Sequence, residues 1–295
     1  MRSVCFFAAY FTSPEIPYYL TIYLKELKKH FNEVLLLCSQ QQLSVASREF
    51  LKREQIGLFV ETNEGFDFGL WYKAFQKYDL EAVDQIALVN DSCILFSPLD
   101  GFMSWSRSTP GDLLGMTCSE AVAPHIQSYF LIINKPAIRF VKDYFSVHGL
   151  ILPLADVIRV YEVGISTYLI SKGLKIESYV DNNGYHGEFS PYYRCVDYHL
   201  SRHIPLIKKK IIFSSYRSDE LLTLARMGFK LAPEHYIALI KKYNKVLIFD
   251  FEKQSTDTGS SMSPLGKIRY QLLSFVIRLL RPLYRKIKHA SKDAS

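Results

Sequence analysis

Gln85-Ile86-Ala87-Leu88-Val89-Asn90-Asp91-Ser92 is the stretch that decides the fold. Its apolar run has the length of a buried strand, and a polar triplet follows the run at once. In sheets of parallel strands covered by helices, ligands bind beyond the carboxyl ends of the strands. The stretch therefore predicts an element of an α/β sheet and, at residues 90–92, a place where a ligand could bind.

Apolar strand-like runs alternate with helically spaced segments upstream of this stretch. Strands are predicted at 4–10, 33–38 and 57–60, and helices at 18–30, 45–55 and 68–78. This alternation predicts an α/β fold with a mostly parallel, Rossmann-type sheet flanked by helices. The second half is less regular, with strands predicted at 113–117, 128–133 and 175–180 and helices at 135–147, 162–172, 218–227 and 233–242.

The positive charge of the chain is concentrated at its C-terminal end. Of the 295 residues 22% are charged, and the net charge is +7. Residues 264–295 contain eight Lys or Arg and one acid, so they carry the whole excess, and the rest of the chain has 28 basic and 28 acidic residues. A nucleic-acid-binding body should carry its own basic surface, so we expect no nucleic-acid partner.

The C-terminal segment is expected to associate with a membrane surface. Residues 255–263 are rich in Ser, Thr and Gly and predict a flexible linker between a domain at 1–254 and a tail at 264–295. Within 265–287, apolar residues at three-to-four spacing alternate with basic ones, which predicts an amphipathic helix lying on an anionic bilayer. The alternative is a helix docked on the body. No apolar stretch approaches the ~20 residues that span a bilayer.

The five cysteines do not form a metal or disulfide pattern. Their number is odd, and no two are spaced as Cys-x-x-Cys. Cys5, Cys38 and Cys93 lie in apolar, strand-like runs, so we interpret them as small buried hydrophobic residues in a reducing compartment.

The first polar cluster joins a predicted strand to a predicted helix and contains Asn63, Gly65 and Asp67. A helix N-terminus presents unpaired N–H groups to anions, and Gly65 and Gly69 would permit close approach of the backbone. The alternative is an ordinary strand–helix turn in which Asp67 caps the helix.

The second cluster is the triplet Asn90-Asp91-Ser92. Asp91 can hold a divalent cation, Mg²⁺ or Mn²⁺, which would neutralise a diphosphate leaving group. One carboxylate alone does not specify a complete metal site, and the alternative is a turn in which Asp91 accepts backbone hydrogen bonds.

Two further groups contain acid–base residues. His125 and Gln127 lie on the same face if their segment is extended, and Glu162 stands at the predicted start of a helix. Glu162 could deprotonate an acceptor hydroxyl, or it could simply complement the helix dipole. The later His186, His199 and His203 fit no zinc spacing and are expected to be loop residues.

These clusters together resemble the rhamnan synthesis protein F family of bacterial polysaccharide glycosyltransferases. The resemblance rests on five stretches in order: residues 63–69, 89–92, 125–130, 161–164 and 205–208. It implies a GT-A-like fold in which Asn63, Gly65 and Asp67 lie near the nucleotide. It further implies that Asn90, Asp91 and Ser92 stand in the place of the usual Asp-x-Asp metal motif, and that His125, Gln127 and Glu162 are site residues.

The implied reaction is transfer of a sugar, rhamnose or a related hexose, from a nucleotide-sugar to a growing lipid-linked glycan. In this interpretation Glu162 and Asp91 are catalytic, and His125 and Gln127 contact the acceptor or a phosphate. The enzyme would be cytoplasmic and would lie peripherally on the inner face of the membrane. The alternative is a catalytically silent scaffold that binds a glycan or a synthase partner there.

Overall fold

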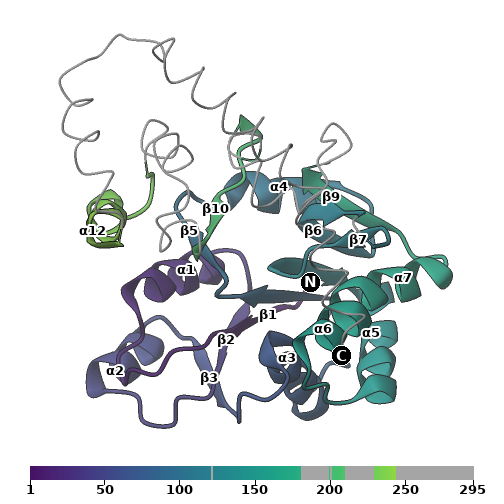
Figure 1. Cartoon of the computed structure of the whole chain (residues 1–295), viewed down its shortest axis with the longest axis horizontal. Coiled ribbons are helices and arrows are strands. Elements are labelled where there is room, and N and C mark those ends of the chain that lie inside the picture. Colours follow the sequence, from purple (N-terminus) through teal and green to yellow (C-terminus); the bar gives the residue numbers. More distant parts are fainter. Residues whose placement is uncertain (121, 181–198, 200, 210–228, 244–295) are drawn as a thin grey trace, which may run out of the picture. The chain divides into compact units, whose positions relative to one another are not determined.

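The computed structural model describes the whole chain except residues 121, 181–198, 200, 210–228 and 244–295 (Figure 1). The chain divides into Met1–Leu247 and Ile248–Ser295, and only the first of these contains described residues. The predicted helix at 218–227, the linker at 255–263 and the tail at 264–295 lie outside the described residues. No described helix combines the length and the apolar character needed to cross a bilayer.

An eight-stranded sheet forms the centre of the first unit. Its order is β3-β2-β1-β4-β8-β6-β7, and β9 pairs with β6. Four neighbouring pairs are parallel: β3–β2, β2–β1, β1–β4 and β6–β9. Three pairs are antiparallel: β4–β8, β8–β6 and β6–β7. The strands are β1 Ser3–Ala8, β2 Glu33–Cys38, β3 Gly57–Val60, β4 Gln85–Asn90, β6 Leu113–Ser119, β7 His125–Ile126, β8 Phe130–Asn134 and β9 Ile176–Val180. The sheet is mixed, and the prediction of a mostly parallel sheet flanked by helices is confirmed.

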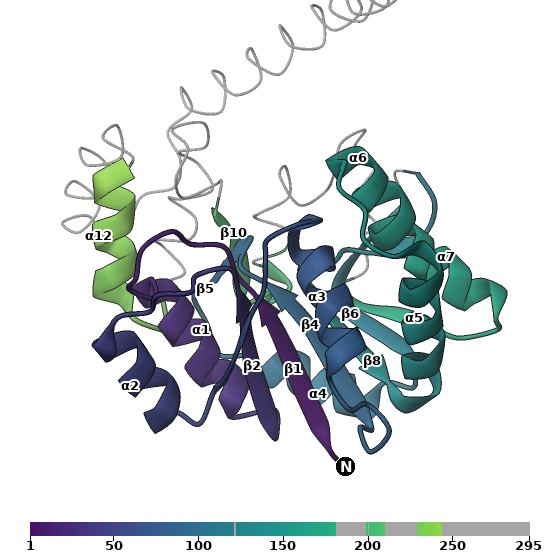
Figure 2. The same ribbon diagram turned by 90° about the horizontal axis from the view of Figure 1, so that it is seen from below.

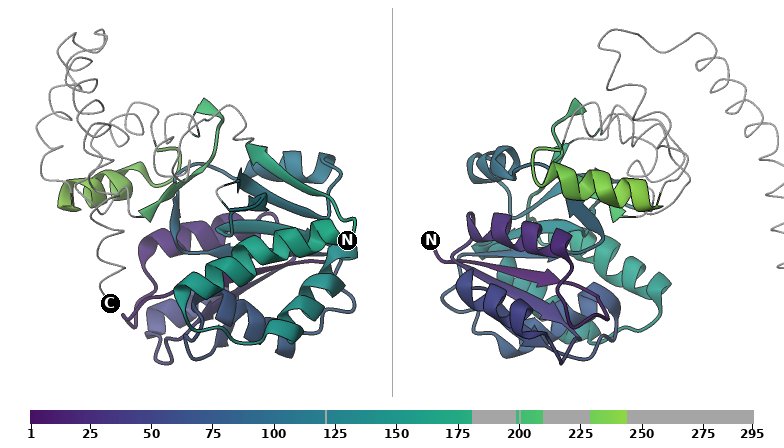
Figure 3. Two further views of the ribbon diagram at one scale, coloured as in Figure 1. Left: turned by 45° about the vertical axis from the view of Figure 1, so that its right-hand side comes forward. Right: turned by 90° about the vertical axis from the view of Figure 1, so that its left-hand side faces the viewer.

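Helices cover both faces of the sheet because alternate strand residues point to opposite sides (Figures 2 and 3). In β1, Cys5 and Phe7 pack in one cluster with residues of α1, α2 and α4. Val4 and Phe6 pack in the other cluster with residues of α3, α5 and α7. The helices are α1 Tyr18–Lys28, α2 Val45–Arg53, α3 Phe66–Lys77, α4 Asp100–Ser108, α5 Lys135–His148 and α7 Gly164–Ser171.

Several elements differ from the prediction. The helix expected at 162–172 is preceded by α6 Leu154–Val157 and by a π-helical segment, Ile158–Val163, so Glu162 lies inside a π-helix rather than at a helix start. The short α4 was not predicted. Its Phe102 and Met103 are buried against the sheet, so tertiary packing rather than local propensity stabilises it. The helix expected at 233–242 is confirmed as α12 Pro233–Tyr243.

A small second sheet connects the two halves of the chain. It consists of β5 Cys93–Leu95 and β10 Leu206–Lys208. Cys93 was expected in a strand-like run, but β10 and the pairing of the two strands were not predicted. The two strands are antiparallel, with Lys208 opposite Cys93. The N–H of Lys209 donates to Ser92 O at 2.9 Å. This pairing holds residues 208 and 209 beside the end of β4.

The predicted roles of cysteine and histidine residues are partly confirmed. Cys5, Cys38 and Cys93 are buried free thiols, as expected. His203 lies in a turn with a φ of 60°. The loop prediction for His199 is wrong, because this residue is helical and buried, and burial lowers the pKa of its imidazole to about 4. Cys195 and His186 lie outside the described residues.

Candidate functional site

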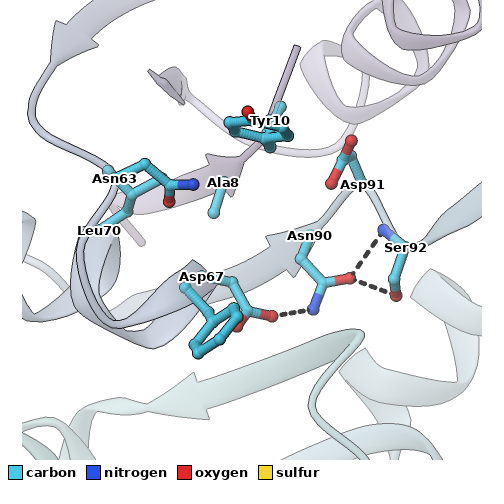
Figure 4. Close-up of a pocket in the computed structure, with 10 residues that line it drawn as sticks. Ala8, Tyr10, Asn63, Asp67, Leu70, Asn90, Asp91 and Ser92 are labelled. Atoms are coloured by element: carbon cyan, nitrogen blue, oxygen red, sulfur yellow. Dashed lines mark hydrogen bonds between the residues drawn. The ribbon is translucent and has the colours of Figure 1, made fainter. Parts of the chain in front are cut away.

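A pocket with a volume of about 380 Å³ opens at the carboxyl ends of β1 and β4 (Figure 4). Small-molecule sites in proteins commonly have volumes of about 300–1,000 Å³, and open α/β sheets place them at this edge. The pocket is lined by Ala8, Ala9, Tyr10, Asn63, Phe66, Asp67, Leu70, Asn90, Asp91 and Ser92.

Most of the residues expected to bind a donor therefore surround one cavity, although they come from two separate parts of the chain. Gly65 is not among the lining residues. Tyr10 and Phe66 line the pocket and were not predicted, and they are 58% and 43% exposed. The sequence signal for Tyr10 is an aromatic residue two positions after the end of a buried strand, whereas Phe66 had no comparable signal.

Backbone geometry at the start of α3 explains the two glycines of the first cluster. Gly65 has a φ of +75°, and a Cβ at this position would lie 2.7 Å from Ile151 O. Gly69 donates its N–H to Gly65 O at 2.9 Å, and a Cβ at Gly69 would lie 1.7 Å from Glu64 O. Both glycines are thus required by the turn itself, and Gly65 shapes the pocket without lining it.

Asp67, Asn90 and Ser92 form one hydrogen-bonded network in the pocket (Figure 4). The Asn90 Nδ2 donates to Asp67 Oδ2, and Asn90 Oδ1 accepts from the Ser92 N–H at 3.1 Å and from Ser92 Oγ at 2.6 Å. Burial raises the pKa of the Asp67 carboxyl to about 6, and the bonds from Asn90 and the Phe68 N–H oppose that shift. This carboxyl consequently loses its proton at a pH closer to neutral than an ordinary aspartate does.

Asp91 is paired with a lysine that lies 118 positions later in the chain. Lys209 Nζ lies 2.6 Å from Asp91 Oδ2 and 3.3 Å from the Tyr19 hydroxyl. Burial raises the pKa of Asp91, whereas Lys209 acts in the opposite direction. Lys208 Nζ donates to Ser92 Oγ at 3.0 Å and lies 4.8 Å from the centre of the Tyr129 ring. Sequence reasoning missed both lysines, although Lys208 ends one of the five stretches that carry the family resemblance.

A second polar group brings together His125, Ser128 and Glu162. Ser128 Oγ donates to Glu162 Oε2, and Glu162 Oε1 lies 3.7 Å from His125 Nε2. The other ring nitrogen, Nδ1, donates to Ala123 O at 2.7 Å, since a carbonyl can only accept. Burial opposes charge on both partners, yet their interaction raises the pKa of His125 and lowers that of Glu162. Each partner therefore favours the charged form of the other.

The two polar groups are neighbours in the fold. The positive charge of Lys208 lowers the pKa of both Asp67 and Glu162, so it acts on each group. Tyr161, the residue before Glu162, stacks on Phe68 of α3 with ring centres 5.3 Å apart and an interplanar angle of 12°. The start of α3 and the π-helix are thus packed together.

Gln127 has a structural partner within the sheet. Its Oε1 accepts from Thr117 Oγ1 at 2.7 Å, and its N–H donates to Thr117 O at 2.9 Å. Neither His125 nor Gln127 nor Glu162 is among the residues that line the pocket. The residues predicted to contact the donor and those predicted to contact the acceptor therefore occupy two adjacent positions rather than one.

Solved structures offer distant similarities to this fold. A cytidylyltransferase from Leptospira borgpetersenii is 12% identical with a TM-score of 0.42, covering 89% of this chain and 99% of the other. A 4-diphosphocytidyl-2C-methyl-D-erythritol synthase from Anaerococcus prevotii is 9% identical with a TM-score of 0.41, covering 61% and 86%. A glucosyl-3-phosphoglycerate synthase from Mycobacterium tuberculosis is 9% identical with a TM-score of 0.33, covering 50% and 67%. TM-scores below 0.5 at such identities carry no conclusion about activity.

Sequence similarity identifies the family directly. No curated protein matches the chain in sequence. Residues 35–257, more than half of the chain, match the family described as rhamnan synthesis protein F. The matched region contains α3 with its two glycines, the end of β4, the π-helix with Glu162, and β10. The chain therefore belongs to the rhamnan synthesis protein F family.

Proposed function

We propose that the protein is a glycosyltransferase that moves a sugar, rhamnose or a related hexose, from a nucleotide-sugar to a growing cell-surface polysaccharide or lipopolysaccharide. The observation that carries this proposal is the pocket at the ends of β1 and β4, which collects Asn63, Asp67 and residues 90–92. The family description, which names the synthesis of a rhamnose polymer, supports the reaction class.

The pocket suits a nucleoside diphosphate because its lining combines aromatic and apolar side chains with polar ones. Tyr10, Phe66 and Leu70 offer aromatic and apolar surface to a flat base. Asp67, Asn90 and Ser92 offer a polar floor, with Lys208 at 3.0 Å from Ser92 Oγ. A donor would place its base against an aromatic ring and its diphosphate toward the lysines.

Glu162 is the base that we propose for the acceptor hydroxyl. Its lowered pKa keeps it ionised at neutral pH. Its Oε1 faces His125 Nε2 at 3.7 Å, which is longer than a hydrogen bond and leaves this oxygen able to accept a hydroxyl proton. His125 would then stabilise the carboxylate in the required orientation.

The membrane surface is the proposed place of action. A lipid-linked acceptor is confined to the bilayer, and the basic segment 264–295 carries the excess charge that would attract the anionic inner face of the cell membrane. We accordingly propose a cytoplasmic, peripherally bound enzyme.

The aromatic residue Tyr10 in the pocket provides the first test. Tyr10→Ala should weaken binding of the preferred nucleotide-sugar by about 5-fold or more, since stacking of a base on an aromatic side chain contributes about 1–3 kcal/mol. The measurement is calorimetric titration of the full chain, after a thermal-shift screen of nucleotide-sugars has identified the preferred donor. Tyr18→Ala is the matched control, because Tyr18 is 57% exposed and lies outside the pocket.

Three outcomes separate the competing functions. Donor binding that depends on Tyr10, together with sugar transfer to a membrane-extracted acceptor, supports the transferase. Donor binding without transfer or hydrolysis favours the silent scaffold. If no nucleotide-sugar or nucleoside diphosphate binds to a cooperatively folded sample, the proposed donor site is wrong.

A further inference from the structure

The family resemblance implies a divalent cation at residues 90–92, and the side chains there do not fit one. Magnesium requires near-octahedral coordination by oxygen atoms at about 2.0–2.1 Å. Asp91 offers one carboxylate, and its Oδ2 is occupied by Lys209 Nζ at 2.6 Å. Asn90 Oδ1 is occupied by two donors from Ser92. An ammonium group therefore stands where the metal would have to bind.

The neighbouring carboxylates are engaged as well. The oxygens of Asp67 accept from the Phe68 N–H and from Asn90, and Glu162 is held by Ser128 and His125. Among the described residues, one cluster of three side chains could hold a metal ion: Glu26, His30 and Asp100, whose possible ligand atoms all lie within 4.8 Å of one another. That group contains none of the pocket residues.

A diphosphate leaving group nevertheless needs positive charge nearby, because negative charge accumulates on it as the glycosidic bond to the donor breaks. The strand pairing of β5 with β10 supplies two ammonium groups at this point. Lys209 neutralises Asp91, so this carboxylate no longer repels the diphosphate. Lys208 reaches Ser92 on the pocket wall, and its charge acts on both Asp67 and Glu162.

We propose that the lysines of β10 replace the divalent cation: Lys208 is the counter-charge of the donor's diphosphate, and Lys209 occupies Asp91 in place of a metal. The proposal rests on the proposed transferase function. In the transfer step the bond between the sugar C1 and the diphosphate oxygen breaks, and its electron pair leaves with the diphosphate. The acceptor oxygen forms a bond to C1, and the acceptor proton passes to Glu162. Both lysines keep their protons throughout, so the step needs no further reactant.

The test is calorimetric binding of UDP, dTDP, GDP and CDP to the full-length protein, in EDTA and in excess Mg²⁺ or Mn²⁺. We expect the affinity of the preferred nucleoside diphosphate to agree within about twofold between these conditions. Lys208→Met should weaken that affinity at least tenfold and leave the affinity for the corresponding nucleoside unchanged. Lys208→Arg should restore most of the loss, because it returns the charge.

Two further variants keep the result interpretable. Lys175→Met removes a lysine that directly precedes β9, pairs with Glu177 and lies outside the pocket lining, so it should not change diphosphate binding. Lys209→Gln combined with Asp91→Asn removes the ion pair as a unit, so no buried charge is left unpaired to unfold the protein. The double variant should still bind the diphosphate in EDTA, though more weakly than the native protein.

The outcomes distinguish this proposal from the transferase function on which it rests. Binding that appears only with Mg²⁺ or Mn²⁺ and disappears in EDTA overturns the lysine proposal and leaves the donor site intact. Diphosphate binding that is unchanged in Lys208→Met also overturns it. Absence of binding by every nucleoside diphosphate, with and without metal, overturns the proposed donor site and this inference together.

Discussion

At the scale of single residues, the site contains two carboxyl groups whose surroundings shift their pKa values in opposite directions. Burial raises that of Asp67 to about 6, whereas hydrogen bonds and the charge of His125 lower that of Glu162 in spite of burial. Groups with such divided pKa values often take different chemical roles. Here Glu162 stays ionised at neutral pH, and Asp67 changes its charge at about pH 6.

Replacement of Asp67 by Asn should stabilise the protein at neutral pH. The folded state binds the Asp67 proton more tightly than the unfolded state, so the free energy of unfolding falls as pH rises from about 4 to about 6. Asp67→Asn removes this loss and should gain up to about 3 kcal/mol at pH 7.5, with little gain at pH 4. Thermal denaturation of both proteins at the two pH values measures the difference.

The same substitution should weaken donor turnover, since Asp67 lines the pocket and accepts from Asn90. A gain in stability at the cost of activity is common for residues retained for function. A stability difference that is equal at pH 4 and pH 7.5 would show that ionisation of Asp67 is not its cause.

At the scale of elements, the turn into α3 determines where the pocket residues stand. Gly65 and Phe66 have φ values of 75° and 60°, so two successive residues adopt left-handed backbone conformations. Such conformations are costly for a bulky residue like Phe66 and persist where neighbouring structure enforces them. The turn thereby directs Phe66 and Asp67 into the pocket.

Gly69→Ala should destabilise the protein by about 3 kcal/mol or more, because the new Cβ would lie 1.7 Å from Glu64 O and the backbone would have to move. Gly101→Ala is the matched control. Gly101 lies in α4, and its nearest contact would be the flexible end of Tyr179 at 3.3 Å, so Ala should be neutral or slightly stabilising there. Chemical denaturation of both variants measures this. Equal stability of the two would refute the steric argument.

The sequence predicted correctly those elements whose own residues show a clear apolar or amphipathic pattern. The strands β1, β2, β3 and β4 are short apolar runs separated by amphipathic helices, and two of them were predicted with their observed bounds. The β5–β10 pair could not be predicted because its hydrogen bonds join residues more than 100 positions apart, and a three-residue strand has no periodicity of its own. The π-helix around Glu162 was missed for a similar reason, since its extra residue is maintained by packing rather than by composition.

In the candidate site too, residues with a local sequence signal were predictable, and residues placed by tertiary contacts were not. That Asn63, Asp67 and residues 90–92 line one pocket could be anticipated, because each group follows a predicted strand and strand ends converge in an α/β sheet. Their partners were not found, because the contacts of Lys209 with Asp91 and of Ser128 with Glu162 depend on tertiary structure.

At the scale of the whole molecule, charge is divided between regions of the chain. The part before residue 264 has equal numbers of acidic and basic residues, and residues 264–295 carry the net charge of +7. A balanced body has no electrostatic reason to bind an anionic surface, so the C-terminal segment would provide the attraction.

Removal of residues 264–295 should therefore abolish co-sedimentation with vesicles that contain anionic phospholipid, while hydrolysis of the soluble donor continues. Vesicles of purely zwitterionic lipid serve as the control and should retain little of the intact protein. The attraction should also weaken with rising salt. Undiminished sedimentation of the truncated protein with anionic vesicles would contradict a role of this segment in membrane binding.

The pairing of β5 with β10 also has a consequence for the order in which the protein becomes competent during its synthesis. Asp91 and Lys209 are 118 residues apart in the chain. At about 5–20 residues per second, a ribosome needs roughly 6 to 24 s to add the intervening segment. During that interval the nascent chain already carries β1 to β4, the strands whose ends form the pocket, but it lacks both lysines. A nascent chain therefore cannot hold a nucleotide-sugar in the proposed way until its second half has emerged.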